Sequence, residues 1–157
     1  MKSEIKFLVL DVDGVLTDGG MYYSESGDEF KKFNTKDGMG IKKVVESGIP
    51  VGFLSSGKNK NLIGNRAKLL GVKFVYVGFK EKLGILDEWR KKLKLSFNEI
   101  AYIGDDINDL KIIAKVGFSA APADAVDKVK KAVNVVLKKK GGEGCVREFI
   151  EKYLIEI

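Results

Sequence analysis

Six short apolar runs alternate with five amphipathic segments along this chain, and that alternation restricts the fold more than any other feature. The apolar runs are KFLVLDV, IPVGFLSS, VKFVYVG, EIAYIGDD, GFSAAP and NVVL. Their near-continuous apolar character is typical of strands that are buried on both faces. Between them, apolar residues recur at helical spacing in segments 40–47, 59–70, 80–93, 108–116 and 123–132. Alternating strands and helices predict a doubly wound α/β fold with a parallel sheet covered on both faces.

The length of 157 residues suits one domain with a full core and is too short for two of ordinary size. We therefore predict a single domain over residues 1–157. The first apolar run is broken by two aspartates, so the sequence predicts neither a signal peptide nor a membrane span. A cytoplasmic location is the corresponding expectation.

Two segments fall outside the alternation. Residues 19–35 contain two short alternating runs around a polar centre, which predicts a β-hairpin protruding after the first strand. Residues 141–154, GGEGCVREFIEKYL, read as a glycine-rich turn that leads into an amphipathic helix. Neither segment is needed to complete the sheet.

The residue types present limit the chemistry. The chain has no histidine and one cysteine, Cys145, which excludes Ser-His catalysis, histidine-metal sites and an intrachain disulfide. The net charge of +6 comes partly from the clusters RKKLKL, KVKK and KKK. No aromatic residues interleave with them, so we interpret them as solvated helix faces and expect no nucleic-acid partner. A positive field would attract a small anionic substrate.

Polar residues gather where the predicted strands end. In chain order they are Asp11, Asp13, Ser55, Ser56, Lys82, Asp105 and Asp106. Ligands of open parallel sheets bind at the carboxyl ends of the strands, so these side chains are expected to converge on one site. Two carboxylates about 4 Å apart repel by roughly 4 kcal/mol at an effective dielectric near 20. A cation must offset this repulsion, and oxygen ligands favour Mg²⁺.

A carboxylate beside a metal ion and a lysine can attack a phosphoryl group. Asp11 and Asp13 lie two residues apart, which places them on the same side of an extended strand. One would attack while the other protonates the leaving oxygen and then deprotonates water. Backbone amides of the glycine-containing turn, and Ser56 with Gly57, could bind the phosphate oxygens. The alternative is an acidic loop that only caps helices, which two acidic clusters on different strands disfavour.

The motif LDVDGVLTDG at residues 10–19 resembles the DxDGxxT signature of the haloacid dehalogenase superfamily. A serine at the second strand end, the lysine of GFKEKL and the acidic GDDINDL follow in that superfamily's order. The resemblance implies that Asp11 is the nucleophile and first metal ligand. It implies that Asp13 is the general acid and base and gives the metal a backbone carbonyl.

The same resemblance implies roles for three later residues. Ser56 would bind phosphate, Lys82 would hold the phosphate and Asp11, and Asp105 would be the second metal carboxylate. The roles of Asp106 and Asp109 stay open, and Asp109 could instead orient Lys82. Ordinary caps and turns are expected at Thr17, Asp18 and Ser55.

The spacing between these motifs leaves no room for a cap domain, because the sheet's own helices and strands take up the intervening residues. The hairpin, FNTKDGMGI, LSSGK, GDDINDL and GGEGCVRE are similar to the capless branch that hydrolyses sugar-acid phosphates. That similarity implies 3-deoxy-D-manno-octulosonate 8-phosphate as substrate. It also implies a homotetramer joined through the hairpins, with active sites at subunit interfaces and the glycine-rich segment reaching a neighbouring site. An ordinary surface hairpin and terminal helix are the alternative.

Three residues depart from that branch, because Lys36, Lys58 and Glu143 stand where arginines are expected. Lysine offers a point charge where arginine binds a carboxylate with two bonds, and glutamate reverses the sign. We keep Lys36 and Lys58 as candidate substrate-binding residues. A nine-carbon ulosonic acid 9-phosphate therefore remains an alternative substrate.

Two other classes of protein are alternatives. A phosphoacceptor signalling domain would need an aspartate at a later strand end, where this chain has Ser56 and Gly78. A binding module that keeps the fold without the activity is suggested by the basic clusters. The chemical competence of every predicted catalytic position disfavours it.

Overall fold

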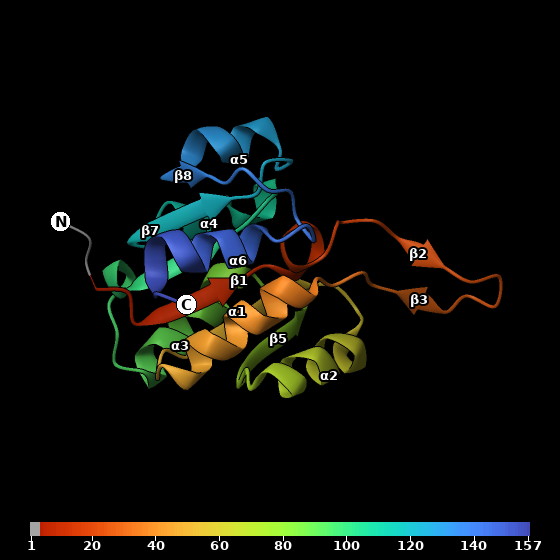
Figure 1. Cartoon of the computed structure of the whole chain (residues 1–157), viewed down its shortest axis with the longest axis horizontal. Helices are drawn as coiled ribbons and strands as arrows, with labels where there is room; N and C mark the ends of the chain where they lie inside the picture. Colours follow the sequence, from red (N-terminus) through yellow and green to blue (C-terminus); the bar gives the residue numbers. More distant parts are fainter. Residues whose placement is uncertain (1–3) are drawn as a thin grey trace.

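The computed structural model describes residues 4–157, which form a parallel sheet between two layers of helices (Figure 1). The strands are β1 (Phe7–Leu10), β4 (Val51–Ser56), β5 (Phe74–Gly78), β6 (Ile100–Ile103), β7 (Phe118–Ala121) and β8 (Val135–Val136). Their order is β5-β4-β1-β6-β7-β8, and each neighbouring pair is parallel. The predicted doubly wound α/β fold is confirmed.

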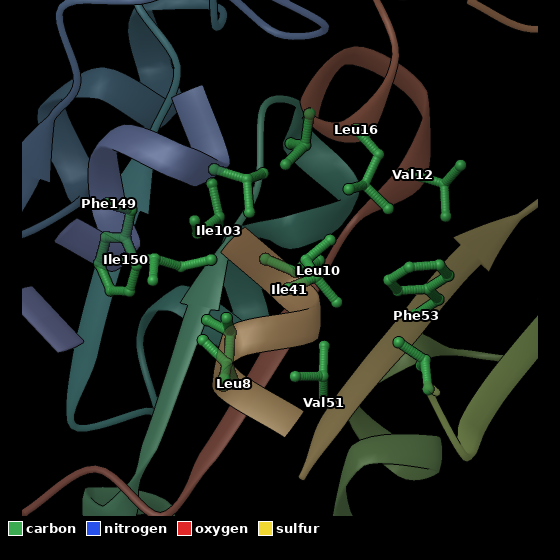
Figure 2. Packing of buried hydrophobic residues seen from close by; sticks show 14 of the residues in the cluster. Leu8, Leu10, Val12, Leu16, Ile41, Val51, Phe53, Ile103, Phe149 and Ile150 are labelled. Atoms are coloured by element: carbon green, nitrogen blue, oxygen red, sulfur yellow. The ribbon is translucent and has the colours of Figure 1, made fainter. Parts of the chain in front are cut away.

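Alternate side chains of the central strand β1 face opposite helical layers. The α-helices are α1 (Thr35–Glu46), α2 (Lys60–Leu70), α3 (Lys82–Lys92), α4 (Leu110–Ile113), α5 (Asp127–Ala132) and α6 (Cys145–Phe149). Leu8 and Leu10 pack with buried residues of α1, α2 and α6, as Figure 2 shows for part of this cluster. Phe7 and Val9 pack with buried residues of α3, α4 and α5. Within residues 4–157, we find no helix with the length and apolar content needed to span a membrane.

Local capping shifts some helix boundaries from those expected. Helix α1 begins at Thr35 rather than near residue 40, because the Asn34 side chain accepts hydrogen bonds from the amides of Lys36 and Asp37. Helix α5 begins later than residue 123, since the amide of Ala123 donates to the carbonyl of Lys139 instead of entering a helix.

The predicted hairpin is present and projects from the sheet (Figure 1). It consists of antiparallel strands β2 (Tyr22–Tyr23) and β3 (Glu29–Phe30). Four large apolar or aromatic residues on it are exposed: Met21, Tyr22, Tyr23 and Phe30. Exposed apolar groups gathered on one element are a common feature of protein–protein contact surfaces.

The glycine-rich segment 141–144 lies against the turn that follows β1 in the same chain. The amide of Gly142 donates to the carbonyl of Val15 at 3.0 Å. A Cβ on Gly141 would lie 1.9 Å from the carbonyl oxygen of Gly14. The segment therefore packs on the first turn of its own subunit, and its predicted approach to a neighbouring active site stays a prediction. Glycines at these positions make the close backbone approach possible.

The buried carboxylate of Asp37 ties helix α1 to helix α6. Its Oδ1 accepts a hydrogen bond from the amide of Arg147 at 2.8 Å. Its Oδ2 has no hydrogen-bond partner within the described part of the chain. Burial raises the pKa of Asp37 to about 6, although backbone amides at the start of α6 oppose the shift.

We expect Asp37 to make folding stability depend on pH. The folded state holds a proton that the unfolded state releases, so this contribution is full at low pH and is lost as pH rises through about 6. Relative to Asp37→Asn, the wild-type free energy of unfolding should fall by on the order of 2 kcal/mol between about pH 4 and about pH 7.5. Urea unfolding at both pH values measures this change. Asp127→Asn is the matched exposed control, and parallel pH profiles for wild type and Asp37→Asn would contradict the assignment.

Candidate active site

The turn after β1 carries the motif that dominated the sequence. Asp11 follows the strand directly, is buried, and its Oδ1 accepts a hydrogen bond from the amide of Val12 at 2.8 Å. The hydroxyl of Thr17 accepts from the amides of Gly14 and Gly19, each at 3.2 Å. Thr17 therefore closes the turn and holds the aspartates at the end of the strand, in agreement with the expected structural role.

Gly14 lies where the acidic residues that follow β1 meet those that follow β6. Its φ is +83°, and a Cβ on it would lie 1.9 Å from Oδ2 of Asp105. Only glycine gives both the left-handed backbone and the space for this carboxylate. The glycine of the motif is thus explained by the approach of Asp105 to Asp11.

Lys82, at the start of α3, lies between two buried carboxylates. Its Nζ is 2.8 Å from Oδ1 of Asp11 and 2.9 Å from Oδ1 of Asp109. The hydroxyl of Tyr102 donates to the same oxygen of Asp109 at 2.5 Å. Oδ2 of Asp109 accepts the amides of Asp105 and Asp106 at 3.0 and 3.3 Å. Both oxygens of Asp109 are thus engaged, an arrangement that fits the orienting role left open for this residue.

The charges of this group are strongly coupled. Burial opposes the charge of Lys82, but the carboxylates of Asp11 and then Asp109 outweigh it and raise its pKa. Burial, followed by the charge of Asp109, raises the pKa of Asp11 well above its usual range, while Lys82 opposes the shift. Burial raises the pKa of Asp105 to about 6. One ammonium does not compensate this concentration of carboxylates, so a further cation is favoured.

Three carboxylates are placed to hold such a cation. One oxygen each from Asp11, Asp105 and Asp109 lies within 4.8 Å of the other two. Since both oxygens of Asp109 already accept hydrogen bonds, Asp11 and Asp105 are the pair best able to act as ligands. The side chain of Asp13 is engaged elsewhere, because Lys31 lies 2.6 Å from its Oδ1. The oxygen-only donors fit a hard divalent ion such as Mg²⁺.

A polar cavity of about 210 Å³ opens beside these groups. Its lining residues are Asp11, Asp13, Gly19, Ser56, Asp105, Asp106 and Asn108. Ser56 is exposed at the end of β4, whereas its neighbour Ser55 is buried. Nδ2 of Asn108 lies 3.4 Å from the Ser56 hydroxyl. The structure thus brings four predicted residues, Asp11, Asp13, Ser56 and Asp105, into one cavity.

Three candidate substrate-binding residues lie outside this cavity lining. Lys58 borders a neighbouring hollow with Glu29 and Asn59. Lys36 is exposed in the first turn of α1. The amide of Gly57 donates to the carbonyl of Gly78 at 3.3 Å, so sheet pairing engages the group expected to bind phosphate.

Sequence reasoning missed Tyr102, Asn108 and Lys31. Tyr102 sits in an apolar strand, where an aromatic residue reads as core, and nothing local signals that its hydroxyl reaches Asp109. Asn108 belongs to the GDDINDL motif, in which only the aspartates stand out as candidate site residues. Lys31 belongs to the hairpin, and only the tertiary fold brings it to Asp13.

Known proteins with similar sequence and structure give one consistent result. A family model of haloacid dehalogenase-like hydrolases matches residues 79–150. A 3-deoxy-D-manno-octulosonate 8-phosphate phosphatase from Haemophilus influenzae is 41% identical over 152 residues, covering 97% of this chain and 84% of the relative. A cobalt-bound structure of the Haemophilus phosphatase has a TM-score of 0.88 at 40% identity, over 94% of this chain and 86% of that one.

A second solved structure carries ligands. The phosphatase from Moraxella catarrhalis, in complex with a magnesium ion, a phosphate ion and a KDO molecule, has a TM-score of 0.90 at 35% identity. The match covers 94% of this chain and 84% of that one.

Strand order, acidic strand ends and these similarities define a haloacid dehalogenase-like hydrolase, and residues 4–157 hold no cap domain over the site. Identity near 40% over almost the full length narrows the class further. The chain belongs to the family of the 3-deoxy-D-manno-octulosonate 8-phosphate phosphatases, which makes it a phosphoric monoester hydrolase.

We expect Gly14→Ala to lower the phosphatase rate strongly, whereas an alanine at a matched glycine outside the site should leave the rate unchanged. The added methyl group would displace Asp105, and displacement of a reacting group by about 1 Å can cost roughly a hundredfold in rate. Gly48→Ala is the control, because Gly48 lies outside the site and the hairpin, its φ is +91° and no atom beyond its chain neighbours lies within 4 Å of an added Cβ. It should lose only about 1 kcal/mol of stability to backbone strain and keep its activity. Phosphatase rates and thermal melts of both variants test this, and equal rate losses would contradict it.

Proposed function

We propose that this enzyme is a Mg²⁺-dependent phosphatase that hydrolyses 3-deoxy-D-manno-octulosonate 8-phosphate through an aspartyl-phosphate on Asp11. The observation that carries the proposal is the buried contact of Lys82 with Asp11, beside a cavity that Asp13 and Asp105 also line. Relatives over nearly the whole chain bear the name of that activity, which supports the substrate. All 157 residues are proposed to act as a single domain.

In the first step, a carboxylate oxygen of Asp11 attacks phosphorus and the bond from phosphorus to the sugar oxygen breaks. Asp13 gives its proton to that oxygen as it leaves. The two side chains line the same cavity, which supports this division of labour. The ammonium of Lys82 stays on Asp11 and balances charge on the phosphoryl group.

In the second step, water attacks the phosphorus of the aspartyl-phosphate. Asp13, now a carboxylate, takes a proton from that water. The bond from phosphorus to Asp11 breaks, which releases inorganic phosphate and restores both aspartates. The fixed hydrogen bonds of Asp109 to Lys82 and Tyr102 keep the lysine in place through both steps.

Asp11 and Asp105 would hold the magnesium ion, with the backbone carbonyl of Asp13. When bound, the ion neutralises negative charge on the carboxylates and the phosphoryl oxygens. The oxygen-only donor set and the raised pKa values of both carboxylates support this assignment. The magnesium and cobalt bound by the relatives agree with it.

The substrate's phosphate would bind at Ser56, whose hydroxyl lies at the cavity surface beside Asn108. The sugar acid would then extend toward Lys58 and Lys36. We propose that four subunits assemble through their exposed hairpins in the cytoplasm and that a neighbouring subunit covers each open site. The exposed fractions of Met21, 72%, and Tyr23, 56%, favour such an assembly.

A nine-carbon ulosonic acid 9-phosphate is the second candidate substrate. Glu143, which stands where arginine is expected, lies 3.6 Å from Lys32, and both side chains are more than half exposed. A carboxylate at this position changes the charge that an incoming sugar acid would meet. This observation favours testing the longer sugar acid directly.

A panel of sugar phosphates tests the proposed function. Phosphate release is measured with and without Mg²⁺, for the eight-carbon and nine-carbon acids and for neutral sugar phosphates. We expect Mg²⁺-dependent turnover with the highest kcat/KM for the eight-carbon acid and none for Asp11→Asn, whereas Asp127→Asn matches wild type. A higher kcat/KM for the nine-carbon acid would show that the nine-carbon acid is the substrate. Full activity of Asp11→Asn would contradict the assignment of Asp11 as the nucleophile.

A measurement of molecular mass in solution tests the proposed assembly. A monomer that is fully selective among the sugar phosphates would contradict active sites shared between subunits.

A further inference from the structure

The side chain of Lys31, directly after hairpin strand β3, is largely buried against the proposed acid and base. Its Nζ lies 2.6 Å from Oδ1 of Asp13 and 3.4 Å from Oε1 of Glu29. Its side chain is only 6% exposed, whereas that of Asp13 is 45% exposed. Lysine is rarely buried to this degree unless its charge is paired. The hairpin thus delivers a fixed cation to a catalytic side chain that is otherwise open to solvent.

These contacts continue beyond the lysine. Oε2 of Glu29 accepts a hydrogen bond from Nδ2 of Asn59 at 2.7 Å. Asn59 directly precedes α2 and follows the loop that begins at Ser56. A chain of polar contacts therefore joins the turn after β1, the stem of the hairpin and the loop after β4, through Asp13, Lys31, Glu29 and Asn59. The sequence motifs do not predict that these three segments are in contact.

Lys31 and Glu29 are held in place by more contacts than Asp13 is. Lys31 is fixed by burial and by two carboxylates, and Glu29 is held by both Lys31 and Asn59. A half-exposed aspartate without such a partner would sample several side-chain rotamers, and ordering it would cost conformational entropy. Proton transfer requires the carboxyl group within hydrogen-bond reach of the leaving oxygen. The ammonium of Lys31 on Oδ1 of Asp13 meets that requirement in advance, and Oδ2 is then the oxygen that carries the proton.

We propose that Lys31 is a positioning residue that holds Asp13 in the orientation needed for proton transfer and couples that orientation to the hairpin. The proposal rests on the proposed role of Asp13 as general acid and base. Lys31 does not touch the reacting atoms, and it acts through Asp13. Because the same hairpin carries the exposed Met21, Tyr22, Tyr23 and Phe30, contacts that order the hairpin would also order Asp13.

The test compares two leaving groups in Lys31→Met. An alkyl phosphate needs a proton from Asp13 as it leaves, whereas the phenolate of para-nitrophenyl phosphate does not. We expect kcat/KM to fall by roughly tenfold to a hundredfold for the alkyl phosphate and by less than about threefold for the aryl phosphate. Lys32→Met is the matched control, because Lys32 is the next residue and is exposed. An equal loss for both substrates would overturn the proposal.

A double-mutant cycle separates action through Asp13 from a general effect on the fold. In an Asp13→Asn background, Lys31→Met should cause no further loss with the alkyl phosphate. Additive losses would overturn the proposal. Glu29→Gln leaves the lysine in place but weakens its anchor, and it should give the same substrate pattern at smaller amplitude. This variant keeps the test decisive if Lys31→Met does not fold.

The outcome for Lys31 is distinct from the outcome for the proposed substrate. If wild type hydrolyses glycerol phosphate and para-nitrophenyl phosphate but neither sugar acid, the proposed substrate fails. The comparison of leaving groups in Lys31→Met then proceeds on glycerol phosphate. If Asp13→Asn keeps wild-type rates on the alkyl phosphate, both the role of Asp13 and the role of Lys31 fall.

Discussion

The contact of the Lys82 ammonium with Asp11 and Asp109 is the interaction on which the site depends. It joins the end of β1, the start of α3 and the turn after β6 at distances of 2.8 and 2.9 Å. Burying an ion pair is costly, and removing one partner leaves an uncompensated charge that typically costs about 3–5 kcal/mol. The enzyme meets this cost with further hydrogen bonds from Tyr102 and two backbone amides to Asp109.

Other features of the fold follow from keeping this group compact. Gly14 lets Asp105 approach Asp11, and a Cβ on Gly104 would lie 2.7 Å from the side chain of Asp109. Gly141 and Gly142 pack directly on the backbone of the turn after β1. A Cβ on either residue would clash with that backbone, so both positions require glycine. The resulting site is polar and open, which suits a phosphate-bearing substrate and leaves selectivity for the sugar to surrounding surfaces.

Much of this architecture could be predicted from the sequence. Apolar periodicity locates strands and helices, and parallel strands necessarily bring their carboxyl ends together, so the convergence of Asp11, Lys82 and Asp105 followed from local patterns. The contacts of Tyr102 and Lys31 could not be predicted, because they join residues whose meeting depends on tertiary placement. The backbone contacts of segment 141–144 with the turn after β1 could not be predicted for the same reason.

The covalent intermediate on Asp11 is the central claim, and its direct detection is the sharpest measurement. Asp13→Asn should form the aspartyl-phosphate and hydrolyse it slowly, because the water lacks its base. Mixing this variant with an aryl phosphate and Mg²⁺, quenching in acid and sequencing the peptides by mass spectrometry should place one phosphoryl group on Asp11. Asp11→Asn under the same conditions should carry none. A phosphoryl group on another residue, or none during continuing turnover, would contradict the account.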